Sequence, residues 1–255
     1  MDKRRAMRDD AVEKLGDPNI SEKDKIKYSK LSITLQKNSI TDVKILLELM
    51  GLQYSEADGE ADAECAALNV ANVTNGVVSE DWDMLLFGCE KLLKNFFDKS
   101  HVVEIDSKIL LRELGMNLEQ LIDLSALLGN DYCPGIIGLK PLIIFKKFKE
   151  CKFDMYVFLD VLRKDKVGHV PSKFVELWLQ SKKYYMEEKF IIKKDAKQIL
   201  WAEPKYKQLY EFLVNDKKFD AGIVNSKINE LKQMYTYYSV KNQLGAFNVV
   251  RRMKL

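Results

Sequence analysis

The stretch GVVSEDWDMLLFG, residues 76–88, decides the fold, because a short apolar run there leads directly into a group of acids. GVVS is typical of a short buried strand, and Glu80, Asp81 and Asp83 follow it at once. Two unit charges about 4 Å apart repel by roughly 1 kcal/mol in water and roughly 4 kcal/mol in a protein-like medium. Grouping these acids therefore requires either bound cations or side chains that spread into solvent.

The composition is not typical of membrane or secreted proteins. The chain has 255 residues, of which 47% are hydrophobic and 31% charged, enough for one large domain or two small ones. No apolar run approaches the roughly 20 residues of a membrane helix, and the basic N-terminal segment lacks the apolar core of a secretory signal. We therefore expect an intracellular protein that has no membrane partner.

The cysteines and histidines narrow the chemistry further. The four cysteines are far apart and form no C-x-x-C pair, which is typical of small core residues in a reducing compartment. Only two histidines occur, so histidine-based metal clusters and Ser–His–Asp catalysis are not expected. An enzyme of this composition would depend on carboxylates, which prefer hard divalent cations. The cysteines are Cys65, Cys89, Cys133 and Cys151, and the histidines are His101 and His169.

Charge is distributed unevenly along the chain, although the formal net charge is only +3. Acids crowd residues 56–64 and 80–83, whereas the first forty residues and residues 140–149 are rich in lysine and arginine. An acidic site flanked by basic surface suits a polyanion that is processed through metal ions.

The hydrophobic periodicity predicts a parallel α/β part followed by helices. Strands are expected at 52–54, 76–79 and 101–106, and almost everything after residue 106 is predicted to be helical. One of these later helices begins with a capping box of Asn117 and Gln120. Three parallel strands with an uncovered edge make a poor domain, so we expect the α/β part to lack its beginning.

The segment EADGEADAE, residues 56–64, has an acid at every even position. Its alanines favour a turn and then a helix, on which Glu60 and Glu64 share a face and Asp62 lies about 200° away. On this stretch alone, a solvated first turn is the favoured explanation, because negative charge suits a helix N-terminus. The helix is expected to bury Ala61, Cys65 and Leu68.

A third acidic segment favours a metal site over simple solvation. Ligands of open α/β sheets bind beyond the carboxyl ends of strands, which is where Asp81 and Asp83 lie. Asp131 follows a helix stop in LLGNDYCPGIIGLKP, residues 127–141. Two divalent cations would offset the repulsion among these acids, and in-line phosphoryl displacement is the reaction that such sites perform.

Three segments strongly resemble the internal region of flap endonucleases, the structure-specific nucleases of the xeroderma-pigmentosum-G superfamily. They are LLELMGLQYSEADGEADAECAAL, VVSEDWDMLLFG and LIDLSALLGNDYCPGIIGLKP; the later LWAEPKYKQLYEFLVNDKKFDAGIVNSKINELK resembles the family's C-terminal core. The resemblance implies an α/β fold with a PIN-like parallel sheet, incomplete at its N-terminal side. A helical domain of the helix-hairpin-helix DNA-binding type would follow it.

The resemblance also implies a set of metal ligands, which in the family bind two magnesium ions. Asp62 departs from the family pattern, which has glutamate there, and Glu64 matches no family ligand. Asp81 is the acid that we assign to catalysis. The implied ligands are Glu60, Asp62, Asp81, Asp83 and Asp131.

Two basic segments are implied to bind DNA. CPGIIGLKP resembles the family turn, with the pattern G-I-G-P-K, that holds duplex phosphate and a K⁺ ion, although an ordinary helix–helix turn would also fit. The chain departs from this pattern, because the second glycine and the lysine after it are absent; Gly135 and Gly138 would permit close backbone approach, and Lys140 would supply the charge. The first forty residues resemble the helical arch that gates a single-stranded flap. Arg8 would reach the scissile phosphate, and the arch lysines, which would alternatively form a solvated face, include Lys30 and Lys37.

The resemblance implies four segments: an arch at 1–40, an internal nuclease α/β domain at 41–128, a helix-hairpin-helix-type domain at 129–234 and a tail at 235–255. The tail sequence NQLGAFNVVRR resembles a sliding-clamp-binding motif at Leu244 and Phe247, and departs from it at Lys241 and Asn248.

The implied function is that of a nuclear, Mg²⁺-dependent endodeoxyribonuclease of the 5′-flap type, with 5′–3′ exonuclease character, acting in DNA replication and repair. The alternative is a non-catalytic homologue that binds branched DNA and needs a separate N-terminal part. Because the family's N-terminal region carries two further metal carboxylates, we expect this chain alone to bind flap DNA but to cleave it poorly.

Overall fold

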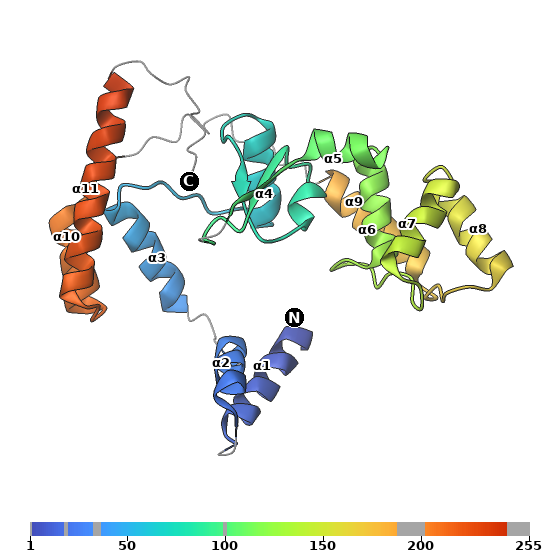
Figure 1. The fold of residues 1–255 in the computed structure, drawn as a ribbon, viewed down its shortest axis with the longest axis horizontal. Helices are drawn as coiled ribbons and strands as arrows, with labels where there is room; N and C mark the ends of the chain where they lie inside the picture. Colours follow the sequence, from blue (N-terminus) through green and yellow to red (C-terminus); the bar gives the residue numbers. More distant parts are fainter. Residues whose placement is uncertain (1, 18–19, 33–36, 99–100, 188–201, 244–255) are drawn as a thin grey trace. The chain divides into compact units, whose positions relative to one another are not determined.

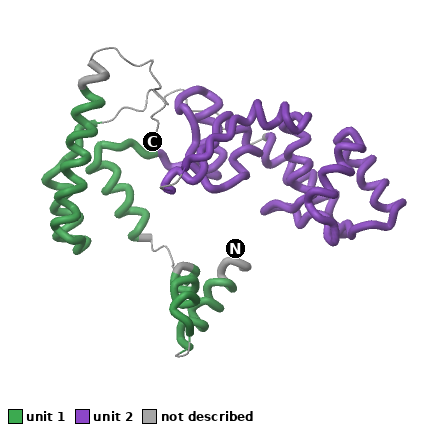
Figure 2. The backbone as a smooth tube through the Cα atoms, viewed as in Figure 1, with its two compact units in different colours: residues 1–54, 200–255 green, residues 55–199 purple. Residues whose placement is uncertain are grey.

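The computed structural model describes residues 2–17, 20–32, 37–98, 101–187 and 202–243. It divides into two compact units (Figure 2): unit 1 comprises residues 1–54 and 200–255, and unit 2 comprises residues 55–199. These units divide the chain at positions other than those of the four expected segments, which remain a prediction. Among the helices within the described ranges, none is both long and apolar enough to cross a membrane.

Within the described ranges, the regular elements of unit 1 are all helices. Helices α1 and α2, which are rich in charged residues, pack against each other, and the Nζ of Lys14 lies 5.3 Å from the ring centroid of Tyr28. A separate core forms where Leu209, Val224 and Ile228 pack against side chains of α3. The elements are α1 (Asp2–Leu15), α2 (Glu22–Ser32), α3 (Lys37–Leu49), α10 (Tyr206–Tyr210), the π-helical turn η2 (Glu211–Asp216) and α11 (Ala221–Gln243).

The strand expected at 52–54 is wrong. The backbone after α3 pairs instead with residues 202–205: Ala202 donates from its N–H to the carbonyl of Gly51, at 2.9 Å, and Lys205 donates to that of Leu49, at 2.8 Å. Gly51 has φ +75°, and a Cβ there would lie 2.1 Å from the carbonyl oxygen of Ala202. Only glycine permits this close approach of two backbones.

Unit 2 contains a three-stranded sheet, with β1 (Val77–Val78), β2 (Lys91–Lys94) and β3 (Val103–Asp106) in that order. The α/β class is confirmed, but the sheet is mixed rather than wholly parallel: β1 pairs parallel to β2, and β2 pairs antiparallel to β3. Strand β2 was not expected, because KLLK has the composition of a helix. Its pairing on both sides supplies the stabilisation that its local propensity lacks.

Helix α4 (Ala61–Val70) buries a different face from the one expected. Ala63, Ala66 and Asn69 are buried, whereas Ala61 and Cys65 are exposed. The cause is Asn69, whose side-chain oxygen accepts hydrogen bonds from the N–H groups of residues 90 and 91, at 2.9 and 3.0 Å. A buried amide must be hydrogen-bonded, so this contact sets the rotation of α4 against the start of β2.

In the described residues 107–187, the second half of unit 2 is helical (Figure 1), with α5 (Ser107–Leu114), α6 (Leu118–Leu128), α7 (Pro141–Glu150), α8 (Met155–Asp165) and α9 (Phe174–Glu187). The predicted capping box is confirmed, because Asn117 accepts from the N–H of Gln120 and the Gln120 side chain accepts from the N–H of Asn117. Phe148, Phe158 and Phe174 are fully buried in the core of this part. Each buried phenylalanine contributes about 1.5–3 kcal/mol relative to an exposed one.

A smaller cluster positions the candidate site within unit 2. Leu86, Ile122 and Tyr185 are buried together, and partly buried side chains such as Phe87 pack against them. Leu86 directly follows the short 3₁₀ turn η1 (Asp83–Leu85), whereas Ile122 and Tyr185 come from α6 and α9. The loop after β1 is thereby packed against two helices of the same unit.

Candidate functional site

The acids after β1 point to different partners. Ser79 Oγ accepts from the N–H of Asp81, and Asp81 Oδ1 accepts from the N–H of Asp83, each at 3.0 Å. Glu80 turns away from this pair, because Lys94 Nζ lies 3.7 Å from its carboxylate and also donates to its backbone carbonyl. The three acids that follow β1 therefore have different surroundings. Glu80 is ion-paired with Lys94, whereas Asp81 and Asp83 remain together at the end of the strand.

Asp83 is held by a tyrosine that lies 102 positions later in the chain. The hydroxyl of Tyr185, on α9, donates a hydrogen bond of 2.6 Å to Asp83 Oδ2. Tyr185 is buried and Asp83 is half-buried. Burial, followed by the hydrogen bond to Asp83, raises the pKa of the Tyr185 hydroxyl, which therefore stays protonated.

The second acidic segment lies at the start of α4. Glu60 is the N-cap residue but makes no side-chain cap, and its carboxylate accepts from the Tyr184 hydroxyl at 3.3 Å. Asp62 is in the first turn of the helix. Glu64, in the same turn, accepts from Ser55 at 2.8 Å, so its carboxylate has a local structural partner.

Asp131 is presented by a turn that one asparagine organises. The side-chain oxygen of Asn130 accepts from the N–H groups of Tyr132 and Cys133, at 3.0 and 2.8 Å. Its amide nitrogen donates to Ser125 and Ser181, at 3.1 and 3.0 Å. Asp131 lies exposed within this pinned turn.

The electrostatics couple the three acidic segments. Burial raises the pKa of the Asp83 carboxyl, the bond from Tyr185 lowers it, and the charges of Asp81, Asp131 and Asp62 raise it again. Burial also raises the pKa of Asp62, as do the charges of Asp81 and Glu60. Segments from α4, from the loop after β1 and from the turn after α6 therefore share one field of negative charge.

The donor chemistry of this acidic cluster fits a hard divalent cation. Carboxylate oxygens are the ligands that Mg²⁺ prefers, and the mutual repulsion here is the kind that a cation offsets. In the described ranges, however, no three acid, histidine or cysteine side chains converge as an assembled metal site. Tyr184 and Tyr185 occupy oxygens of Glu60 and Asp83 instead. That Glu60, Asp62, Asp81, Asp83 and Asp131 are metal ligands remains a prediction.

An aromatic wall of four residues beside the acids was not expected from the sequence. The ring of Tyr185 lies 4.9 Å from that of Phe87 and 5.7 Å from that of Tyr132, and Tyr132 lies 4.5 Å from Tyr184. The pair of adjacent tyrosines at 184–185, in an otherwise lysine-rich helix end, is the only signal for it in the sequence. The wall consists of Phe87, Tyr132, Tyr184 and Tyr185.

The expected DNA-binding turn, residues 135–140, is rigidly held. Gly135 is buried at φ +77°, and a Cβ there would lie 2.7 Å from the backbone nitrogen of Gly129. Ile137 and His169 form an antiparallel bridge, with hydrogen bonds of 3.0 and 2.8 Å. Gly138, at φ +85°, is exposed, and Lys140 is the N-cap residue of α7.

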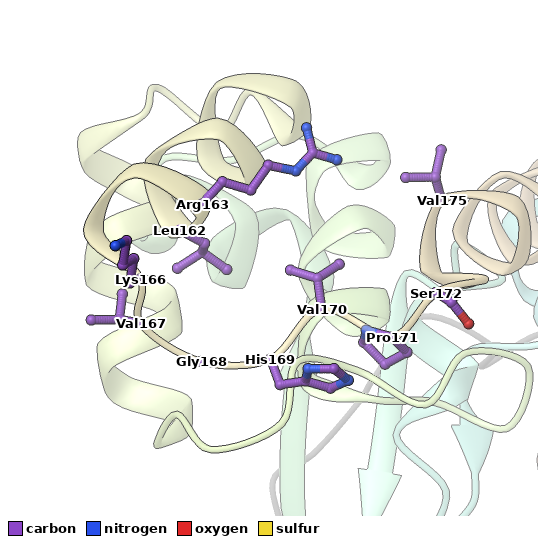
Figure 3. Close-up of a pocket in the computed structure, with 10 residues that line it drawn as sticks. All are labelled: Leu162, Arg163, Lys166, Val167, Gly168, His169, Val170, Pro171, Ser172 and Val175. Atoms are coloured by element: carbon purple, nitrogen blue, oxygen red, sulfur yellow. The ribbon is translucent and has the colours of Figure 1, made fainter.

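A pocket of about 490 Å³ lies beside this turn, between the end of α8 and the start of α9 (Figure 3). Its polar lining includes Arg163, Lys166 and His169, and it contains no member of the acidic cluster. Figure 3 shows Arg163 extending toward Val175 across the space. This basic hollow was not expected from the sequence.

The remaining expected site residues belong to unit 1. Arg8 lies on α1, where its guanidinium binds Asp9 at 3.0 Å. The side chains of Lys30 and Lys37 lie outside the described residues, as do Leu244 and Phe247 of the expected clamp-binding tail. The roles assigned to these residues remain predictions.

Comparison with known proteins gives consistent matches. The family described as the XPG I-region matches residues 51–131. Flap endonuclease 1 of Candida glabrata is 31% identical over 263 residues, which cover 100% of this chain and 67% of the relative. Flap endonuclease 1 of Glycine max is 33% identical over 236 residues, which cover 90% of this chain. The chain spans only 61% of the length of the Glycine max relative.

Solved structures share the fold. The flap endonuclease-1 from Methanococcus jannaschii aligns with a TM-score of 0.65 at 24% identity, covering 87% of this chain and 68% of that chain. The catalytic core of Rad2 in complex with a DNA substrate aligns with a TM-score of 0.64 at 22% identity, covering 82% and 72%. The similarity in sequence, extending over the whole chain, and the shared fold agree: the chain belongs to the flap endonuclease family.

Proposed function

We propose that this chain acts as a metal-dependent, structure-specific endodeoxyribonuclease that hydrolyses phosphodiester bonds in branched DNA near a 5′ flap, in DNA replication and repair. The observation that carries the proposal is the coupling of Asp83 to Asp81, Asp131 and Asp62, which come from three separate segments. Family membership supports the reaction class. The nucleus is the proposed compartment, because DNA replication and repair take place there.

Two Mg²⁺ ions are the proposed cofactors, with Glu60, Asp62, Asp81, Asp83 and Asp131 as the residues that would hold them. When bound, such ions supply an activated water and stabilise the leaving oxygen of an in-line displacement. The donor set is all carboxylate, which suits this metal.

The residues of the chain itself orient this set. Tyr185 fixes one oxygen of Asp83, and the Asp81 carboxylate accepts from the Asp83 N–H. These two bonds fix the orientation of the two aspartates relative to each other. Asn130 keeps the turn that carries Asp131 in one conformation. Arg8 is proposed to neutralise phosphate charge, after exchanging its surface partner Asp9 for the substrate.

Duplex DNA is the proposed partner of the turn at 135–140. Gly135 and Gly138 permit close approach of backbone to phosphate, Lys140 supplies charge, and a K⁺ ion held by the turn's carbonyls is part of the proposal. The basic lining of the adjacent pocket, from Arg163 to His169, extends the positive surface. Lys30 and Lys37 are proposed to line an arch around the single strand, and the tail from residue 235 to bind a sliding clamp.

A second candidate is a branched-DNA-binding homologue without catalytic activity. One observation favours it: no three potential ligands in the described part of the chain converge as an assembled metal site. Such a protein would grip the substrate through the same basic surface and leave the phosphodiester intact.

One assay separates the two candidates. The full chain is mixed with a labelled 5′-flap substrate, with Ca²⁺ to measure binding and with Mg²⁺ to measure cleavage, and with an unbranched duplex of the same sequence as the substrate control. Asp81→Ala removes a proposed ligand, and Glu64→Ala is the matched control, since it removes an acid of α4 that bonds Ser55. Mg²⁺-dependent cutting that is lost in Asp81→Ala and kept in Glu64→Ala supports the nuclease. Flap binding without cutting supports the second candidate, and absence of flap binding contradicts both.

A further inference from the structure

Tyr185 and Asp83 form a short polar contact between the wall and the acidic cluster, at 2.6 Å between hydroxyl and Oδ2. The comparable contact from Tyr184 to Glu60 is longer, at 3.3 Å. An ionised carboxylate only accepts hydrogen bonds, so Tyr185 is the donor, and the bond occupies one of the two carboxylate oxygens. Oδ1 of Asp83 remains for another partner.

The tyrosine that makes this bond has little freedom to move. It is 4% exposed and packs in the cluster with Leu86 and Ile122. Edge-on contacts from the rings of Phe87, at 4.9 Å, and Tyr184, at 5.6 Å, hold its own ring. The hydroxyl is therefore placed before any ligand arrives, and the carboxylate that it binds is fixed with it.

We propose that Tyr185 is a positioning residue for Asp83, holding Oδ2 so that Oδ1 is presented to a divalent cation in the acidic cluster. The inference rests on the proposed function, because it gives Asp83 the role of a cation ligand. A carboxylate that binds a metal is commonly oriented by a hydrogen bond to its other oxygen, and loss of such a partner costs about 10–100-fold in metal affinity. The phenol thus lowers the entropy cost of ordering Asp83 when the cation binds.

The test measures metal binding directly, without DNA or turnover. Free Mn²⁺ is followed by electron paramagnetic resonance during titration into the full chain and into three variants. Tyr185→Phe removes only the hydroxyl and keeps the ring. Tyr156→Phe removes a hydroxyl from an exposed ring elsewhere in the unit and is the matched control. Asp81→Ala reports whether the acidic cluster is the binding site.

We expect Mn²⁺ binding that is lost in Asp81→Ala, unchanged in Tyr156→Phe and weakened about 10–100-fold in Tyr185→Phe. Equal affinity of Tyr185→Phe and the unaltered chain would overturn the positioning role while leaving the proposed function in place. If the unaltered chain binds no more Mn²⁺ than Asp81→Ala does, the proposed metal site is wrong, and the inference is overturned with it.

A second measurement keeps the inference testable if Tyr185→Phe folds poorly. A near-ultraviolet difference spectrum of the unaltered chain is recorded as Mg²⁺ is added, and the same spectrum is recorded for Tyr184→Phe. A cation on Oδ1 of Asp83 withdraws electron density from the carboxylate whose Oδ2 accepts from the Tyr185 hydroxyl. A tyrosine difference band is therefore expected in both proteins. Mn²⁺ binding with no tyrosine band in either protein would show that Tyr185 does not act on the ligand.

Discussion

The indole nitrogen of Trp178 donates a hydrogen bond of 2.6 Å to Oδ1 of Asp123, inside the helical part of unit 2. Lys182 Nζ lies 3.0 Å from Oδ2 of the same carboxylate, and all three residues join α6 to α9. Burial raises the pKa of Asp123 despite these partners, whereas hydrogen bonds to Glu119 and Asp123 outweigh burial and raise the pKa of Lys182. The carboxylate is the more deeply buried of the pair, so its desolvation cost is the larger one.

Trp178→Phe is expected to lower the free energy of unfolding by about 2–4 kcal/mol, because a hydrogen bond to a buried charge is lost and a smaller ring leaves space in the core. Urea unfolding followed by circular dichroism measures the change. Tyr156→Phe, which alters an exposed ring 5.5 Å from Trp178, is expected to change it by less than about 0.5 kcal/mol. Equal losses in the two variants would contradict the role of the buried bond.

The pH dependence of stability should report the raised pKa of Asp123. Because the native pKa lies above the ordinary value of about 3.9, the native state binds the proton more tightly than the unfolded state does. The cost of the buried charge is therefore fully present above the native pKa and is relieved as the pH falls toward the unfolded value. Relative to Asp123→Asn, the unaltered chain is expected to gain stability over that interval, as measured by urea midpoints at several pH values. A difference that is constant with pH would contradict the raised pKa.

Gly135 and Gly138 should respond differently to alanine. Gly135→Ala is expected to cost about 2–5 kcal/mol, because left-handed strain adds to overpacking against the backbone of Gly129, 2.7 Å from the new Cβ. Gly138→Ala is expected to cost only about 1–2 kcal/mol, since the nearest atom to its Cβ is 4.0 Å away. Thermal unfolding of both variants provides the comparison. The reverse order of stability would show that the turn is not packed as described.

DNA binding through Lys140 should depend on charge and not on sequence. Lys140→Ala is expected to weaken binding to duplexes of different sequence about equally and to reduce the slope of log affinity against log salt by roughly 1. Fluorescence anisotropy at several salt concentrations measures both quantities. Lys147→Ala is the matched control on the same helix, because Lys147 is already paired with Asp165 at 3.0 Å. A change confined to one sequence, or an unaltered slope, would contradict a phosphate contact at Lys140.

Much of the helical part could be predicted from local signals. The capping box of Asn117 and Gln120 acts within four residues, and it is found where the sequence places it. The turn that carries Asp131 follows the helix stop at Gly129, also as expected. Such features depend on neighbouring residues alone, so periodicity and capping patterns are sufficient to find them.

The predictions from sequence were wrong where residues distant in the sequence decide the structure. Strand β2 is stabilised by pairing with β1 and β3, and the face of α4 is set by hydrogen bonds from Asn69 to residues 90 and 91. Tyr185 reaches Asp83 across 102 positions in the sequence. No local pattern contains these partners, so the aromatic wall beside the acids could not be predicted.

Helix α9 carries Trp178 and Lys182, which both bond the buried carboxylate of Asp123. The tyrosines that contact the acidic cluster follow a few residues later on the same helix. A single inserted or deleted residue between Lys182 and Tyr184 would turn everything beyond it by about 100° and shift it by about 1.5 Å. Tyr185 would then leave Asp83, although every side chain of the site was still present. The number of residues between Lys182 and Tyr184 should therefore stay unchanged during evolution.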